Sequence, residues 1–398
     1  METTVHDRCL AGEICCGCSA CAVICPVDAI HMAFDKTGMY RPVIDEGKCV
    51  NCHLCEKLCV MRLDSDVAFQ PLSRDEVYVS VARDRSVLQR SSSGGIGYVF
   101  AKKGLESGKP VCGVVYDTEH ECAAHIVCRD ESGLRRTQGS KYLQSANEPA
   151  FREILAQSEG IIFGTPCQIA AADAILRQSR KRGAFLLVDI FCHGVPNQLL
   201  WKGHLRYLQG KKKISAGAVA SFREGKRFRI RIGGYKAWYN EDAFYTFFLR
   251  GWMKNLSCYN CRFRRNSCAD IRIGDCLVPK YAALSFSPSC IIVNTESGKA
   301  FLDLCRSELE LYPESFQVID NIQERENVPV PANWKQRLRS LQNGAFPENL
   351  IRNVMRKGRV KSFAKNKLLK FVFLRRGTDD LKALARSGLS DKRHIHKS

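Results

Sequence analysis

The chain has 398 residues, of which 45% are hydrophobic and 26% are charged, as is typical of a soluble protein with a substantial core. No apolar stretch approaches the roughly 18 residues of a membrane-spanning helix, and residues 1–13 lack the features of a secretory signal. Composition therefore argues against an integral membrane protein and a secreted one. Because the chain carries 21 cysteines and a net charge of +20, we expect a cytoplasmic protein with a basic surface.

The first motif along the chain is a cysteine run that occurs twice. Both copies follow the spacing C-x2-C-x2-C-x3-C, the first over Cys15–Cys25 and the second over Cys49–Cys59. This spacing is typical of bacterial ferredoxins, in which three thiolates of one run bind a 4Fe-4S cluster and the fourth binds the other cluster. Zinc prefers two separated C-x2-C pairs, and disulfides need a secreted chain, so we favour iron–sulfur clusters over both.

This arrangement assigns every cysteine of the two runs. The first cluster takes Cys15, Cys18, Cys21 and Cys59, and the second takes Cys49, Cys52, Cys55 and Cys25. The segment between the runs, Ala29–Ile44, predicts two strands joined by a turn at Asp35–Gly38. We therefore predict an α+β bacterial-ferredoxin domain over residues 1–64. Cys16 lies between two ligands and receives no role.

Strand-like and helix-like segments alternate through the middle of the chain. Strands are predicted at 76–82, 110–116, 122–128, 160–164, 185–191, 271–274 and 291–294, and helices at 93–106, 168–177 and 197–208. This alternation predicts an α/β domain with a mixed sheet over residues 72–326, and the ends of its strands are where we expect a site.

Three features lie at those strand ends. Ser91–Gly95 precedes a helix, where small residues admit a phosphate or simply cap the helix. Cys167 and Cys192 each end an apolar strand before a predicted helix, a position that favours the thiolate. Cys258 and Cys261 form a further C-x2-C pair. Packing is the better explanation of each cysteine alone, but together the four supply the ligands of a third cluster.

The order of these motifs resembles one family, that of the coenzyme F420 hydrogenase/dehydrogenase beta subunits, in particular its bacterial members with a fused ferredoxin domain. The motifs are the ferredoxin run, Ser91–Gly95, Gly139–Tyr142, Gly164–Gln168, Phe191–Pro196, Cys258–Cys261 and Ala269–Asp275. The resemblance covers residues 10–310. Family members are iron–sulfur flavoproteins, so the resemblance implies that the α/β domain binds FAD.

The resemblance also implies the residues of the site. The third 4Fe-4S cluster would be held by Cys167, Cys192, Cys258 and Cys261. The FAD site would be lined by Ser93, Gly94, Gly95, Lys141 and Tyr142. Thr165, Pro166 and His193 would lie close to the flavin or the cluster. After Asp275 the chain departs from the family, because Cys276-Leu277-Val278 replaces the usual Phe-Trp-Gly. Two interpretations of Cys268 and Cys276 therefore stay open: both are packing residues, or one of them replaces an assigned ligand.

The implied cofactors predict an oxidoreductase. Clusters pass single electrons and flavin exchanges one or two, so we expect electrons to pass from an acidic one-electron donor such as ferredoxin to a two-electron substrate. Relatives associated with polysaccharide synthesis imply a small or glycan-linked substrate. Two alternatives stay open: a non-catalytic electron-transfer subunit that docks on another enzyme, and an oxidoreductase that uses coenzyme F420. The sequence assigns no catalytic residue.

The C-terminal extension, residues 327–398, is predicted to be a basic helical or partly disordered tail. From Lys335 to Ser398 there are 18 Lys and Arg residues against 4 Asp and Glu residues, and a smaller basic cluster lies at Arg223–Arg231. Such a tail suits docking to an acidic donor or an anionic membrane surface, or is merely solvated. Nucleic acid is a weaker expectation because no recognition module accompanies the charge.

Overall fold

The ferredoxin and α/β segments belong to one structural unit that ends at Phe346. The structure is a computed structural model and describes residues 14–62, 70–223, 228–281, 284, 286–323, 326–344 and 346. The rest of the predicted C-terminal extension, residues 347–398, lies outside the described residues. Within the described part of the chain, no helix has the length and apolar character needed to cross a bilayer.

The ferredoxin-like segment consists of two short helices and a hairpin. Its elements are α2 (Ala20–Val23), β1 (Ile30–Phe34), β2 (Tyr40–Ile44) and α3 (Leu54–Lys57). The strands pair antiparallel, with Ile30 opposite Ile44. The Asp35 carboxylate accepts a hydrogen bond from the Thr37 backbone N–H at 2.8 Å, and Gly38 supplies the left-handed residue of the turn at φ 74°. The predicted strand–turn–strand segment is confirmed.

The two cysteine runs share one backbone conformation. The residues before and after the second cysteine of each run are left-handed. Around Cys18 they are Gly17 (φ 69°) and Ser19 (φ 68°), and around Cys52 they are Asn51 (φ 53°) and His53 (φ 58°). Left-handed residues curl a loop so that its N–H groups form a concave surface for a negative charge. The internal repeat predicted from spacing is therefore present in the backbone.

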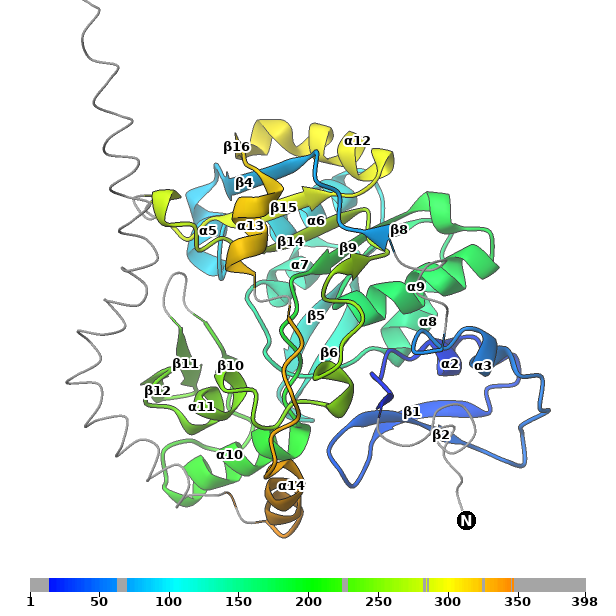
Figure 1. Ribbon diagram of the computed structural model, residues 1–398, viewed down its shortest axis with the longest axis vertical. Coiled ribbons are helices and arrows are strands. Elements are labelled where there is room, and N and C mark those ends of the chain that lie inside the picture. The colour runs from blue at the N-terminus through cyan, green and yellow to red at the C-terminus, as the bar shows by residue number, and fades with distance from the viewer. Residues whose placement is uncertain are drawn as a thin grey trace, which may run out of the picture. The chain divides into compact units, whose positions relative to one another are not determined.

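The α/β segment is built on a nine-stranded mixed sheet with the order β16-β4-β15-β14-β9-β8-β5-β6-β7 (Figure 1). Its strands are β4 (Val77–Ala82), β5 (Val111–Asp117), β6 (Cys122–Cys128), β7 (Ser145–Ala146), β8 (Gly160–Gly164), β9 (Phe185–Ile190), β14 (Ile271–Asp275), β15 (Ser289–Val293) and β16 (Leu309–Pro313). The neighbouring strands β5, β8, β9 and β14 run parallel. The carboxyl ends of β8 and β9 therefore meet at one edge, which is where sites lie in such sheets.

Helices cover both faces of this sheet. The core on one face includes residues of α5 (Arg85–Arg90), α6 (Ile96–Glu106), α7 (Glu131–Thr137) and α12 (Glu296–Cys305). The core on the other face includes residues of α8 (Glu148–Ala156) and α9 (Pro166–Gln178). Residues Cys18, Ala20 and Val60 join this second core, so the ferredoxin-like segment packs beside α8 and α9 (Figure 1).

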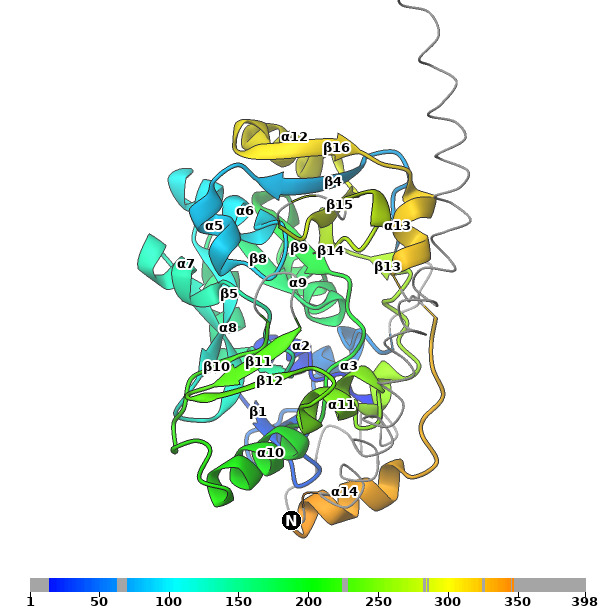
Figure 2. The same cartoon turned by 90° about the vertical axis from the view of Figure 1, so that its left-hand side faces the viewer.

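A smaller lobe lies beside the large sheet (Figure 2). It contains α10 (Gln198–Gly210), a three-stranded sheet of β10 (Ala220–Ser221), β11 (Arg229–Ile232) and β12 (Tyr235–Trp238), and α11 (Ala243–Leu249). Two further short strands, β3 (Gln70–Pro71) and β13 (Asn266–Ser267), pair with each other, and α13 (Phe316–Ile322) follows β16.

The first part of the predicted C-terminal extension is packed structure. It forms α14 (Trp334–Gln342), which contacts α10. The indole N–H of Trp334, a residue only 4% exposed, donates to the Lys254 carbonyl at 3.0 Å. The sequence suggested a tail because Lys and Arg dominate this stretch, but a buried Trp anchors it.

Candidate metal centres

The outer site, as we call the pocket lined by Cys25, Cys49, Cys52 and Cys55, gathers the four thiols predicted for the second cluster. The Ala29 backbone N–H donates to the Cys25 sulfur at 3.3 Å. Cys52 is exposed, and the neighbouring Val50 is 61% exposed. This site is therefore open to solvent on the side of Val50 and Cys52.

The inner site, as we call Cys15, Cys18, Cys21 and Cys59, gathers the thiols predicted for the first cluster. Cys21 interacts electrostatically with the other three. Burial, with a contribution from Cys18, raises the pKa of Cys15 to about 12 and that of Cys59 to about 11. These thiols are neutral near pH 7 unless a cation stabilises the thiolates, and a cluster with soft iron centres suits this donor set.

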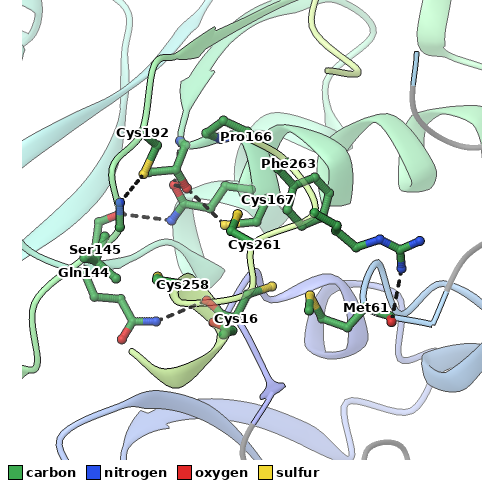
Figure 3. Close-up of a pocket in the computed structure, with 16 residues that line it drawn as sticks. Cys16, Met61, Gln144, Ser145, Pro166, Cys167, Cys192, Cys258, Cys261 and Phe263 are labelled. Carbon is green, nitrogen blue, oxygen red and sulfur yellow. Dashed lines mark hydrogen bonds between the residues drawn. The ribbon is translucent and has the colours of Figure 1, made fainter. Parts of the chain in front are cut away.

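A third pocket is lined by Cys167, Cys192, Cys258 and Cys261 (Figure 3). Cys167 follows β8 and Cys192 follows β9, so the adjacent parallel strands bring them together. Cys258 ends the short 3-10 helix Leu256–Cys258, and Cys261 lies in the loop behind it. No three Cys, His, Asp or Glu side chains of the described residues are placed to hold a single metal ion.

Cys167 and Cys192 have different electrostatic surroundings. A hydrogen bond from Cys16 lowers the pKa of Cys167, although burial opposes it, and the Thr165 hydroxyl and the first N–H groups of α9 act in the same direction as Cys16. Burial raises the pKa of Cys192 to about 12. The predicted bias toward thiolate therefore holds for Cys167 and is wrong for Cys192, because the next helix, α10, begins only at Gln198.

The loop that carries Cys258 and Cys261 is fixed by a polar clamp. Arg264 donates to the Cys258 carbonyl at 3.0 Å. The side-chain oxygen of Asn327 accepts from the Cys261 backbone N–H and from Arg264, both at 3.0 Å. The spacing of the cysteines could not predict this clamp, because Asn327 is 66 residues from Cys261 in the sequence.

A buried ion pair supports the same loop from the sheet. The Nε and Nη2 groups of Arg272 on β14 donate to the two carboxylate oxygens of Asp189 on β9, at 2.7 and 2.6 Å. Arg272 also donates to the Asn266 carbonyl at 3.0 Å. Arg272 is 1% exposed and Asp189 is fully buried. Removing one partner would leave an uncompensated charge in the core, so this pair fixes where the loop leaves the sheet.

The structure brings the two predicted FAD-binding loops together. The Ser140 backbone N–H donates to the Ser92 hydroxyl at 2.8 Å. Ser93 and Gly94 instead face β15, where both bind the Ser289 hydroxyl at 3.0 Å. A Cβ atom on Gly94 would lie 2.3 Å from the Ser80 carbonyl oxygen, so strand packing already requires this glycine. Gly95 has φ 77° and precedes α6.

Lys141 and Tyr142 already have protein partners. The Lys141 ammonium donates to the carbonyls of Thr137 at 2.7 Å and Gln138 at 2.9 Å, which caps the end of α7. Burial lowers its pKa to about 7. The Tyr142 ring stacks on Phe248 at 5.0 Å between centroids. A flavin phosphate would have to compete with the carbonyls for Lys141.

A polar pair missed from the sequence lies beside Tyr142. Arg223 forms an ion pair with Asp275, the last residue of β14, and also interacts with Tyr142. The Arg223 side chain is fully buried, whereas that of Asp275 is 32% exposed. The motif that ends at Asp275 indicated one member of this pair. The other member, Arg223, was interpreted only as part of a basic cluster.

Of the remaining predicted residues, Thr165 and Pro166 line the third pocket, whereas His193 does not. Thr165 caps α9, with its N–H donating to the Gln168 side chain at 3.0 Å, and both Thr165 and Pro166 line the pocket. His193 is exposed. Neither Cys268 nor Cys276 lines the pocket, but Cys16 of the ferredoxin run does.

Comparisons with known proteins agree with this division of the chain. Residues 14–62 match the family described as "4Fe-4S dicluster domain". Residues 159–316 match the family described as the C terminus of the beta subunit of coenzyme F420 hydrogenase/dehydrogenase. The second match contains all four cysteines of the third pocket.

The proteins similar to the chain include three whose names describe them as follows. The F subunit of the F(420)H(2) dehydrogenase of Methanosarcina mazei is 19% identical over 310 residues, 75% of this chain and 84% of the relative. An uncharacterized protein of Methanocaldococcus jannaschii is 37% identical over 43 residues, 11% of this chain and 18% of that protein. A solved F420-reducing [NiFe] hydrogenase complex from Methanosarcina barkeri contains a chain that matches with a TM-score of 0.48 and 16% identity, over 71% of this chain and 94% of that one.

Proposed function

Because the chain belongs to the family of coenzyme F420 hydrogenase/dehydrogenase beta subunits and carries a dicluster ferredoxin domain, we propose that it is an iron–sulfur flavoprotein oxidoreductase. It relays electrons between a one-electron donor protein and FAD. The observation that supports this relay best is the sequence of contacts between the three sets of thiols. Cys55 of the outer site interacts with Cys21 of the inner site, and the inner loop reaches the third pocket through Cys16.

When bound, 4Fe-4S clusters supply single-electron transfer, and FAD supplies the exchange between one-electron and two-electron steps. In this proposal Cys167, Cys192, Cys258 and Cys261 hold the third cluster. The Arg264–Asn327 clamp and the Arg272–Asp189 pair hold its loop in place. The exposed rim of the outer site receives an acidic donor such as ferredoxin.

Iron content tests the third cluster. Anaerobically purified protein is expected to contain about twelve iron atoms per chain, four for each of three clusters. The double variant Cys258→Ser and Cys261→Ser should retain about eight, because the ferredoxin runs supply separate ligands. The matched control is Cys276→Ser, whose thiol is buried outside the pocket. About eight iron atoms in the unaltered protein would refute the third cluster.

The FAD site is proposed at the two adjoining loops, with Ser93, Gly94, Gly95, Lys141 and Tyr142 as its residues and Thr165, Pro166 and His193 toward the third pocket. Denaturation should release FAD from the purified protein. Since burial lowers the pKa of Lys141 to about 7, its ammonium loses its proton as pH rises through this value. If it binds a flavin phosphate, FAD affinity should fall between pH 6 and 9, and Lys141→Gln should abolish that dependence. A chain that never carries FAD contradicts this proposal.

A second candidate is favoured by the name of one relative, a subunit of an F(420)H(2) dehydrogenase. In this version the chain is an electron-transfer subunit within a larger enzyme and exchanges electrons with coenzyme F420. Anaerobic mixing of the purified protein with reduced F420, NADH, NADPH or candidate nucleotide sugars distinguishes the two candidate functions. Bleaching of the clusters by reduced F420 alone favours the second. Reoxidation of the reduced protein by a sugar substrate favours the first.

A further inference from the structure

Ser257 is a buried polar residue in the third pocket, next to a proposed cluster ligand. It directly precedes Cys258, it is 6% exposed, and it lines the pocket (Figure 3). Its hydroxyl oxygen is buried and has no hydrogen-bond partner among the residues that the structure describes. A buried hydroxyl group without a partner costs stability, so such groups normally bind something. The acceptor for this hydroxyl is therefore expected inside the pocket.

The other polar side chains of the pocket already have protein partners. Those with hydroxyl, amide or guanidinium groups make hydrogen bonds of 3.0 to 3.2 Å to other protein atoms; they are Gln144, Ser145, Thr165, Gln168 and Arg262. The Gly194 backbone N–H donates to the Cys192 sulfur at 3.4 Å. Among the described residues of the lining, Ser257 alone has a hydroxyl group without a partner.

The backbone around Ser257 is fixed by hydrogen bonds. The side-chain oxygen of Asn255 accepts from the Ser257 backbone N–H at 3.3 Å, at the start of the 3-10 helix Leu256–Cys258. Asn255 is fully buried, and its own backbone N–H donates to the Val195 carbonyl at 3.0 Å. The Cys258 backbone N–H donates to the Asn255 carbonyl at 2.9 Å. Ser257 and Cys258 thus share one fixed turn, so a group held by Cys258 in this pocket lies beside Ser257.

We propose that Ser257 donates an O–H hydrogen bond to a sulfur atom of the third cluster and thereby raises the reduction potential of that cluster. The inference rests on the proposed third cluster. The sulfur atoms of a 4Fe-4S cluster accept hydrogen bonds, and such a bond stabilises the more negative, reduced state. Reduction adds one electron from the one-electron donor protein, and no bond forms or breaks. The proton stays on Ser257, because the hydroxyl group remains a donor in both states.

The test compares Ser257→Ala, which removes the donor, with Ser257→Thr, which keeps a hydroxyl group. Ser80→Ala is the matched control, because Ser80 is also fully buried and its hydroxyl has no partner among the described residues, but it lies on β4 and does not line the pocket. The measurements are iron content and a redox titration of the anaerobic protein followed by electron paramagnetic resonance. All three variants should retain about twelve iron atoms.

The expected effect is confined to the third cluster of Ser257→Ala. At a fixed potential its ratio of reduced to oxidised cluster should fall about tenfold, which for a one-electron couple is a shift of about 59 mV toward more negative potential. Ser257→Thr and Ser80→Ala should stay near the unaltered protein. Electron–nuclear double resonance before and after exchange into D2O gives a second readout. One exchangeable proton coupled to the reduced third cluster should be missing in Ser257→Ala and present in Ser257→Thr.

Four results would overturn the inference. An unchanged potential and an unchanged proton signal in Ser257→Ala would mean that the hydroxyl binds something other than the cluster, such as a water molecule. An equal shift of potential in Ser80→Ala would make the effect one of general packing. Loss of about four iron atoms in both Ser257 variants would make the residue only a structural support of the ligand loop. If the unaltered protein contains about eight iron atoms, the third cluster itself is absent, and that failure is visible before any variant is made.

Discussion

The inner and outer cysteine loops have the same spacing and the same left-handed positions, but their surroundings are opposite. Gly17 in the inner loop touches Tyr40 and Gln144, whereas Asn51 at the same position of the outer loop is exposed. Cys16 points into the α/β domain, whereas Val50 points to solvent. A repeated motif therefore gives two similar metal sites with different neighbours. This difference defines a direction between a loop exposed at the surface and a loop buried against the α/β domain.

Exchanging the residues at the equivalent positions 17 and 51 tests this comparison most strongly. Gly17→Asn places a Cβ atom 2.4 Å from the Tyr40 carbonyl oxygen and 2.5 Å from the Gln144 side chain, so the inner loop must leave its place. We expect a loss of stability above about 4 kcal/mol and loss of the inner cluster. Asn51→Gly relieves a left-handed Asn and should change stability by less than about 1 kcal/mol. Thermal unfolding and iron content measure both, and equal effects would refute the asymmetry.

Chelation should separate the two sites in time. Because Cys52 is exposed and Cys18 is buried, a chelator under air is expected to remove the outer cluster first. About four of twelve iron atoms should leave in a fast phase, and the rest in a slower one. Mössbauer or paramagnetic resonance spectra taken between the phases identify which cluster has gone. Simultaneous loss of all iron would show that burial does not protect the inner site.

Asn147 holds the inner loop to the α/β domain and has no counterpart at the outer loop among the described residues. Its fully buried amide donates to the Cys18 carbonyl at 3.0 Å and accepts from the Ser19 hydroxyl at 2.8 Å. Asn147→Ala should lower the free energy of unfolding by about 2 kcal/mol, because two buried polar groups lose their partner. Val50→Ala on the exposed loop should change it by less than about 0.5 kcal/mol. Chemical denaturation of both variants is the measurement, and similar values would contradict the expected difference.

The smallest effect is expected from removing residues 347–398. The structural unit ends at Phe346, so iron and FAD content should not change. If these basic residues attract an acidic donor to the outer site, electron transfer should slow at low ionic strength. At about 0.15 M salt the Debye length is about 8 Å, and most of this difference should disappear. Loss of binding to anionic vesicles after truncation would instead identify a membrane surface as the partner. Equal rates at every salt concentration would leave these residues without a docking role.

The central strands could be predicted because each is an apolar run between turn residues. Strands β6 and β8 lie at the residues predicted for them, Cys122–Cys128 and Gly160–Gly164. The small sheet was missed because β11 alternates Arg with Ile, and the charge was more conspicuous than the alternation. Residues 327–398 were predicted to be a basic helical or partly disordered tail, and the packing of α14 was not predicted because its polarity hides the single Trp that anchors it.

The site was predictable where ligands follow one another at fixed spacing. The grouping of Cys25 with Cys49, Cys52 and Cys55 depends only on that spacing, and the structure brings these thiols together. The position of Cys16 in the lining of the third pocket depends on which side of its loop meets the α/β domain, and the cysteine spacing does not determine that. The same holds for the Arg223–Asp275 pair, whose members are 52 residues apart. Contacts of this kind arise from tertiary packing.

The Asn327 clamp has a consequence for the order in which the protein is made. During synthesis the N-terminal part of a chain folds first. All ferredoxin ligands have been synthesised once residue 59 is added, whereas the loop of Cys258 and Cys261 gains its Asn327 contacts only after 66 residues beyond Cys261 have been added. Iron can therefore be inserted in two episodes, with the ferredoxin pair completed on a nascent chain and the third pocket closed only near the end of translation.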